Sequence, residues 1–245
     1  MTALAGRRGL VVGGSTGIGG AIARAWSGAG MDVHVLSRSQ PGALRWSPVD
    51  LTDPEAARTV LEAAGREPLD AVAFSAVSYG DKRATFSDTP LDQWRTQVEV
   101  NLHGLWLTLA ATLPSLRAAQ PGLFINVSSE VVFNGGPGRS GYAATKAAGA
   151  SLVDSVYQEE DPDLVRIVSV LPAGMVDSPG IRRRRPADFD YSDYMRPESF
   201  APIALTLATT AGADHNGDNL VVHPDGTWTP IHDHTPISQS HRSRV

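Results

Sequence analysis

Tyr142 and Lys146 are the two residues of this sequence whose types and spacing point most directly to chemistry. They lie early in a helical pattern over residues 140–158, and a spacing of four places both side chains on one helix face. A free phenol has a pKa of about 10, and a nearby ammonium group favours the phenolate and lowers that pKa. The pair is therefore a candidate general acid for a carbonyl oxygen. The alternative is a packed tyrosine beside a surface lysine.

Lysine is rare in this chain, which has 19 arginines but only Lys82 and Lys146. Either the lysine at 146 is there by chance, or its position requires a compact ammonium that arginine cannot replace.

Two further polar residues stand where they can serve the same chemistry. Ser129 follows an apolar strand pattern over residues 123–127, at the strand end where doubly wound sheets bind ligands, and its hydroxyl can bond a substrate oxygen. No His or Asp is spaced to make it a nucleophile, so we do not expect a hydrolase. Asn101 lies inside a helical pattern over residues 91–118, where propensity disfavours an amide. A solvated polar helix position is its alternative explanation.

A glycine-rich turn follows the first apolar strand pattern and precedes a helical one. Such a turn lets backbone amides and a helix N-terminus approach a pyrophosphate. Its spacing, Gly-x-x-x-Gly-x-Gly, differs from the standard dinucleotide fingerprint, and an ordinary strand-to-helix turn is the alternative. The residues expected to contact a cofactor here are Gly13, Ser15, Thr16, Gly17, Ile18 and Gly19.

The end of the second strand pattern indicates which nucleotide is preferred. It carries Arg38 and no carboxylate, and an arginine there accommodates a 2′-phosphate whereas an acidic residue holds the 2′-hydroxyl of NAD. The sequence thus favours NADP(H), unless Arg38 is simply solvated. Asp50, after the third strand pattern, either bonds the adenine or caps the next turn.

The order of elements predicts an α/β fold. Short apolar runs alternate with helical patterns, which implies one doubly wound parallel sheet, Rossmann-like, with helices on both faces. The expected strands are residues 9–13, 32–36, 44–49, 71–75, 123–127, 165–170 and 219–222. The expected helices are residues 17–28, 53–64, 91–118, 140–158 and 197–211. Residues 37–43 are too few for a helical crossover, so a tight loop is expected there.

Composition narrows the class of protein. The 245 residues carry a formal charge of −5 and no cysteine, which argues against nucleic-acid binding, disulfides and cysteine metal sites. No apolar run reaches the roughly 20 residues of a membrane helix, and the N-terminus lacks a signal-peptide pattern. We expect a cytoplasmic protein that binds no metal, with one domain over residues 1–230 and a poorly ordered tail over 231–245, unless the tail docks on a neighbouring subunit.

Taken together, these motifs resemble the single-domain short-chain dehydrogenase/reductases over about residues 7–228. The features occur in the family's order: the glycine turn, Asp50, Asn101, Ser129, Tyr142 and Lys146, then Pro172. The resemblance implies that Tyr142 donates the proton to a carbonyl, that Lys146 lowers its pKa and holds the nicotinamide ribose, that Ser129 orients the substrate oxygen, and that Asn101 holds a water. It also implies cofactor contacts at Leu51, Ser75, Ala76 and Pro172.

Some positions depart from the family pattern. Val12 replaces the usual Thr, residues 74–77 replace Asn-Asn-Ala-Gly, and either Asp177 or Ser178 replaces a Thr near the nicotinamide. The altered segment leaves open a second function, a non-catalytic NADP(H) sensor or scaffold. An imine or enone reductase is a third reading. The leading expectation is an NADPH-dependent reductase of a small-molecule ketone or aldehyde, reversible with the alcohol.

The substrate end is less sharply defined. Residues 178–196 form an irregular polar segment, interpreted as a substrate loop or lid, and Arg182–Arg185 within it are a hypothetical site for an anionic substrate. A solvated basic loop or contacts to cofactor phosphates are the alternatives. The resemblance implies a homodimer or homotetramer built on the helices at 91–118 and 140–158. The histidines show no convincing zinc spacing.

Overall fold

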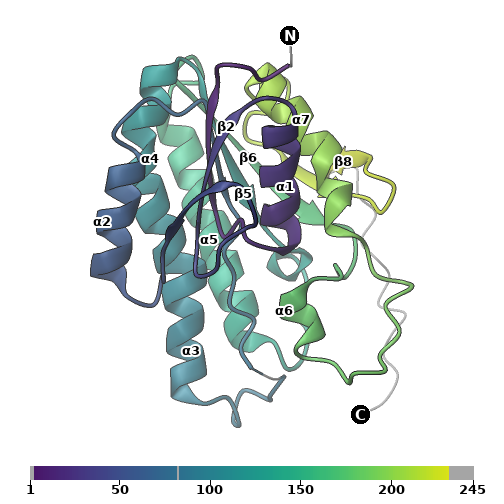
Figure 1. The fold of residues 1–245 in the computed structure, drawn as a ribbon. Coiled ribbons are helices and arrows are strands. Elements are labelled where there is room, and N and C mark those ends of the chain that lie inside the picture. Colours follow the sequence, from purple (N-terminus) through teal and green to yellow (C-terminus); the bar gives the residue numbers. More distant parts are fainter. Residues whose placement is uncertain (1–2, 82, 232–245) are drawn as a thin grey trace.

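The fold is built on a single eight-stranded sheet, seen in a computed structural model that describes residues 3–81 and 83–231 (Figure 1). Its strands follow the order β3-β2-β1-β4-β5-β6-β7-β8, and all neighbours are parallel except β7 and β8. The bounds are β1 Arg8–Val12, β2 Asp32–Ser37, β3 Arg45–Pro48, β4 Ala71–Phe74, β5 Gly122–Val127, β6 Val165–Pro172, β7 Asn219–Val222 and β8 Trp228–Pro230. The predicted doubly wound sheet is confirmed.

Helices cover both faces of this sheet. One face carries α1 (Gly17–Gly28) and α7 (Ala201–Thr210), and the other carries α2 (Pro54–Ala64), α4 (Gly104–Ala119) and α5 (Ser140–Glu159). The pleat of β1 divides its side chains between these layers: Val11 packs toward α1, while Leu10 and Val12 pack toward α2 and α4. Both faces of the central strands are thus buried, which explains why these strands are apolar nearly throughout.

The connection between β2 and β3 is a short loop without a helix, as expected. The two strands are nevertheless parallel, with His34 opposite Arg45 and Ser37 opposite Pro48. Gly42 lies in the loop with a φ of +66°, a conformation that favours glycine.

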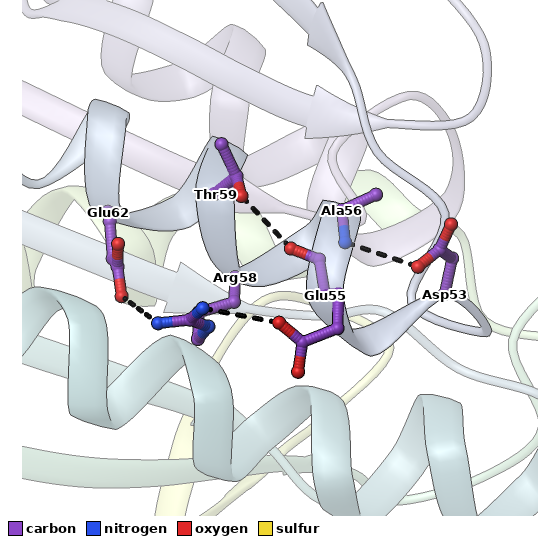
Figure 2. Close-up of polar contacts among 6 residues, drawn as sticks. All are labelled: Asp53, Glu55, Ala56, Arg58, Thr59 and Glu62. Atoms are coloured by element: carbon purple, nitrogen blue, oxygen red, sulfur yellow. Dashed lines mark hydrogen bonds and ion pairs between the residues drawn. The ribbon is translucent and has the colours of Figure 1, made fainter.

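Local capping fixes the start of α2 (Figure 2). Asp53 precedes the helix and its Oδ1 accepts a hydrogen bond from Ala56 N at 3.1 Å, with Pro54 at the first helical position. Arg58 lies between Glu55 and Glu62, with nitrogen–oxygen distances of 3.2 Å to each. The predicted helix over 53–64 therefore begins one residue later, because Asp53 is its cap.

Three expectations for individual elements need correction. The helix expected over 197–211 is a 3₁₀ turn over Pro197–Phe200 followed by α7. The helix expected over 91–118 is α3 (Leu91–Val98), a π-helical turn over Glu99–His103, and α4. The three-residue strand β8 was not expected at all. It forms a hairpin with β7 through Asp225 and Gly226, where Asp225 Oδ1 accepts from Thr227 N at 3.0 Å.

The segment after β6 contains a short helix, α6 (Pro179–Arg182), and its two ends are hydrogen-bonded to each other. Met195 N donates to Met175 O at 2.8 Å, and Asp177 N donates to Met195 O at 2.8 Å, so the two ends of the segment lie side by side. Between them, the rings of Phe189, Tyr191 and Tyr194 pack edge to face with centroids 4.9–5.6 Å apart. The segment interpreted as a loop is therefore packed on its own side chains. The tail from residue 232 lies outside the described residues.

Candidate active site

The three residues expected to do chemistry meet at the carboxyl end of β5. Ser129 follows this strand and caps the 3₁₀ turn over Glu130–Val132, while Tyr142 and Lys146 lie in the first turns of α5. All three are buried. Lys146 Nζ donates to Val127 O at 2.8 Å, which ties α5 to the end of β5. The helix spacing and the strand end thus bring the phenol, the ammonium and the hydroxyl into one place.

The electrostatics of Tyr142 differ from the expectation. We expected Lys146 to lower its pKa, but burial raises the pKa of Tyr142 well above its ordinary value, and neighbouring Tyr79 and Glu130 raise it further. A hydrogen bond with Ser129 and the charge of Arg139 lower the pKa without reversing this. The Lys146 ammonium donates to the Val127 carbonyl, and burial is the largest influence on the pKa of Tyr142. Tyr142 is therefore protonated at neutral pH.

Lys146 is itself perturbed by burial. Desolvation lowers its pKa from an ordinary 10.5 to about 8. It remains mostly charged at neutral pH, and the charge is held in a low-dielectric part of the cleft.

The Asn101 side chain joins the loop after β4 to helix α5. Its Nδ2 donates to Ser78 O at 2.9 Å and to Thr145 Oγ1 at 3.0 Å, and its Oδ1 accepts from Ser78 N at 2.7 Å. It lies in the π-helical turn, a feature often found at functional sites. The amide in the helix is thus buried and satisfied rather than solvated. Whether it also holds a water stays a prediction.

The glycine turn brings backbone close to backbone. Gly13 has a φ of +83°, and a Cβ placed on it would lie 2.4 Å from Ala76 N. A Cβ on Gly19 would lie 2.5 Å from Gly13 O. A side chain is therefore excluded at both of these positions. Thr16 precedes α1 without making a side-chain cap, and the first turn of the helix holds no acidic residue. These features fit an anionic group such as a pyrophosphate.

A continuous cleft of about 1060 Å³ connects this turn with Ser129, Tyr142 and Lys146. Most of the residues expected to bind cofactor or substrate line it: Gly13, Ser15, Thr16, Gly17, Ile18, Arg38, Asp50, Leu51, Ser75, Ala76, Ser129, Tyr142, Lys146 and Pro172. Gly19 and Asn101 do not line it, because Gly19 packs behind the turn against Ser75 and Asn101 is buried between Ser78 and Thr145. The cleft lies beside β1 and β4, where the strand order reverses.

The structure bears on two choices that the sequence left open, namely the role of Asp50 and whether Asp177 or Ser178 faces the cofactor. Asp50 Oδ1 accepts from Thr52 N at 3.0 Å and Thr52 Oγ1 at 2.8 Å, so Asp50 caps the turn, and these bonds lower its pKa. Asp177 forms a bidentate ion pair with Arg182 at 2.6 Å. Ser178 instead lines the cleft beside Gly17, whose Cβ would lie 3.4 Å from that of Ser178. Ser178 is thus the better placed of the two to face a cofactor.

Two charged residues that lie near Ser129, namely Glu130 and Arg139, were not identified from the sequence. Ser129 Oγ donates to Glu130 Oε2 at 2.9 Å, and Arg139 pairs with Glu130 at 3.1 Å. Glu130 directly follows Ser129 in the sequence, which is a signal that the strand-end argument could have used. Arg139 gives no such signal, because only the folded loop before α5 brings it to Glu130.

Residues 3–81 and 83–231 contain neither a cluster of metal-binding side chains nor a membrane-spanning helix. No group of three or more His, Cys, Asp or Glu residues there is placed to hold a metal ion. His215 instead pairs with Asp218 at 2.9 Å. Within the same residues, no helix is long and apolar enough to cross a membrane. His232, His234 and His241 lie outside the described residues.

Fold and site together define a class, a Rossmann-like α/β protein whose glycine turn and buried Tyr142 line one cleft. The model of the short chain dehydrogenase family matches residues 8–188. The chain belongs to the short-chain dehydrogenase/reductase family and is an oxidoreductase of that family.

Known relatives agree with this assignment over most of their length. An uncharacterized oxidoreductase of Staphylococcus haemolyticus is 27% identical over 91% of this chain and all of its own. The structure of a 3-oxoacyl (acyl-carrier-protein) reductase from Agrobacterium tumefaciens with NADP bound is 27% identical, with a TM-score of 0.78 over 90% of this chain and 94% of that one. An aldohexose dehydrogenase of Thermoplasma acidophilum shares the fold, with a TM-score of 0.81 at 23% identity over 97% and 98% of the two chains.

Proposed function

We propose that this oxidoreductase uses NADP(H) to reduce a ketone or aldehyde to an alcohol, and that it also catalyses the reverse oxidation. The observation that carries the proposal is the meeting of Ser129, Tyr142 and Lys146 in the cleft that also contains the glycine turn. The NADP-bound reductase from Agrobacterium tumefaciens supports the choice of cofactor and of reaction.

Tyr142 is the general acid of this proposal. Its raised pKa keeps the proton on the phenol oxygen at neutral pH, so the proton is available to a carbonyl oxygen on which negative charge develops. Ser129 orients that oxygen from the end of β5. The positive charge of Lys146 stabilises the phenolate that remains after proton transfer, because both groups lie on the same face of α5. A bound nicotinamide supplies the hydride.

The cofactor residues follow from the cleft. The amides of the glycine turn and the start of α1 would hold the pyrophosphate, with Ser178 beside them. Arg38 is exposed at the end of β2 and lines the cleft, where its fork suits a 2′-phosphate. The absence of a carboxylate at this strand end supports NADP(H) over NAD(H).

Two other functions have specific observations behind them. A non-catalytic sensor of NADP(H) was suggested by the altered residues 74–77. Hydrogen bonds nonetheless fix the backbone on both sides of this segment. Ser75 N donates to Val12 O at 2.8 Å, and the Asn101 side chain bonds to both backbone groups of Ser78. Reduction of an imine or enone would use the same tyrosine.

We further propose a cytoplasmic homodimer or homotetramer. A chain without cysteine suits a reducing compartment. The exposed rings of Trp94 on α3 and Trp106 on α4 support an interface on these helices.

The direct test is turnover of a panel of ketones, aldehydes, imines and enones with NADPH and, separately, NADH. Loss of NADPH absorbance with carbonyl compounds, faster than with NADH, supports the proposal. Selective turnover of imines or enones favours that alternative. NADPH binding without turnover of any compound favours the sensor, and failure to bind either nucleotide contradicts all three.

A further inference from the structure

Arginines gather at the substrate end of the cleft. Five arginines line it together with Ser129 and Tyr142: Arg83, Arg139, Arg183, Arg184 and Arg185. They come from three segments: the loop after β4, the loop before α5 and the segment after α6. The same end holds two carboxylates, Asp81 and Glu130, and Glu130 is already paired with Arg139. Positive charge is therefore in excess beside the catalytic residues.

The arginines of the 182–185 run have different partners. Arg182 is held by both carboxylate oxygens of Asp177, stacks on Tyr191 at 4.5 Å, and does not line the cleft. Arg185 donates through Nε and Nη2 to Tyr194 Oη, at 3.3 and 3.1 Å. The hypothesis that all four arginines bind substrate therefore needs correction, because Arg182 is committed elsewhere.

Arg184 has a buried nitrogen that the described part of the fold leaves without a hydrogen bond. Its Nε is buried and has no hydrogen-bond partner among the described residues. Its guanidinium lies 5.6 Å from the centre of the Tyr79 ring, and that ring in turn lies 5.1 Å from the ring of Tyr142. One aromatic ring thus separates this guanidinium from the proposed proton donor.

The positive charges of these arginines repel one another. Burial lowers the pKa of Arg184, and the charges of Arg83 and Arg185 lower it further. Arg83 is affected in the same way by burial, Arg139 and Arg185. Guanidinium groups stay charged in proteins, so this repulsion is present in the folded state. A bound anion would relieve it and supply the acceptor that Arg184 Nε lacks.

We propose that the substrate carries an anionic group, a carboxylate or a phosphate, and that Arg184 binds this group while the carbonyl lies at Tyr142. The inference rests on the proposed reductase function and narrows its substrate class. Arg83 and Arg185 add positive charge around the anion, and Tyr79 fills the space between the anion and the reacting carbonyl. The substrate is an oxo acid or an oxo phosphate.

The kinetic test compares matched substrates with NADPH as reductant. Oxo acids of three to eight carbons are each measured beside their own amides, and dihydroxyacetone phosphate beside dihydroxyacetone. We expect kcat/KM to favour at least one anion over its neutral partner by about tenfold or more, and Arg184→Gln to reduce that ratio by about tenfold to a hundredfold. Arg184→Lys, which keeps the charge but not the fork, should lie between.

Arg182→Gln is the matched control. It removes the same charge from the same segment but outside the cleft, so the anion-to-neutral ratio should stay at the wild-type value. The KM for NADPH should also stay unchanged in Arg184→Gln, since a rise would mean that Arg184 binds a cofactor phosphate instead. Turnover of neutral carbonyls without any preference for an anion would overturn the inference and leave the reductase proposal standing.

A binding measurement decides the matter even if no compound is reduced. Calorimetric titration with benzoate, phenyl phosphate and benzamide, in saturating NADP⁺, separates anion binding from turnover. Binding of an anion that Arg184→Gln abolishes and Arg182→Gln retains supports the inference. Equal binding of benzoate, phenyl phosphate and benzamide overturns it.

Discussion

Burial of the charged Lys146 side chain destabilises the folded protein. The side chain's pKa of about 8, instead of 10.5, corresponds to about 3 kcal/mol that disfavour the charged form in the folded protein. Below pH 8 the lysine is protonated in both folded and unfolded states, so the folded state bears this penalty in full. From pH 8 to 10.5 the unfolded state binds more protons, and the free energy of unfolding rises with pH.

We therefore expect Lys146→Met to stabilise the protein at pH 7 by about 1–3 kcal/mol while it impairs catalysis. Urea unfolding of both proteins at pH 7 and pH 9.5 measures this. The stability difference should shrink at the higher pH. A variant that is less stable than the wild type at pH 7 would mean that the bond from Lys146 to Val127 outweighs the burial of the charge.

We expect Glu130 to influence the pH dependence of alcohol oxidation, the reverse of the proposed reduction. Its charge raises the pKa of Tyr142, and alcohol oxidation needs the phenolate, so the rate should rise with pH toward that pKa. Glu130→Gln should move the rise in kcat/KM for oxidation to lower pH. Glu55→Gln, which changes an exposed carboxylate on α2, should leave the profile where it is. A rise at higher pH in Glu130→Gln would contradict this account.

At the residue scale, the sequence predicted which side chains meet but not how they are charged. Spacing alone placed Tyr142 and Lys146 on one face of a helix. The expected lowering of the Tyr142 pKa was wrong. This pKa depends on how deeply the phenol is buried and on its neighbours Glu130 and Tyr79, which only the fold brings near. Arg184 could be noticed in the Arg182–Arg185 run, but its unsatisfied Nε could not.

At the scale of elements, local capping predicts a measurable effect in α2. Asp53→Ala removes the side chain that caps Ala56 N, and should lower the free energy of unfolding by about 1 kcal/mol. Urea unfolding checks the change. Arg58→Ala in the same helix removes only exposed ion pairs and should have little effect. Equal losses in the two variants would argue against the cap.

The period of apolar residues predicted the seven parallel strands because most of these are buried on both faces; the edge strand β3 is the exception, with every residue exposed or half-buried. It missed β8, whose three residues are too few for a pattern and whose position depends on the turn at Asp225 and Gly226. It also predicted one continuous helix where a π-helical turn separates α3 and α4. Asn101 in that turn bonds to Ser78 and Thr145, and the pattern of apolar residues gives no sign of these contacts because both partners are distant in sequence.

At the scale of the whole molecule, cofactor binding should stabilise the fold. A ligand at 100 times its Kd adds about 2.7 kcal/mol, which raises the Tm of a chain of this size by about 5–10 °C. We expect NADPH to give a larger shift than NADH at equal concentration, and Arg38→Asp to remove the advantage of NADPH. Thermal unfolding with each nucleotide measures the shifts. A larger shift with NADH in the wild type would contradict the proposed role of Arg38.

The most direct test of the central claim is the rate of NADPH-dependent carbonyl reduction by the wild type and by Tyr142→Phe, with NADPH affinity measured by fluorescence on the same samples. The account predicts that the wild type turns over and that the variant loses about a hundredfold to ten-thousandfold in kcat while its affinity for NADPH stays near the wild-type value. Turnover by Tyr142→Phe at the wild-type rate would show that the tyrosine is not the proton donor, and would contradict the account.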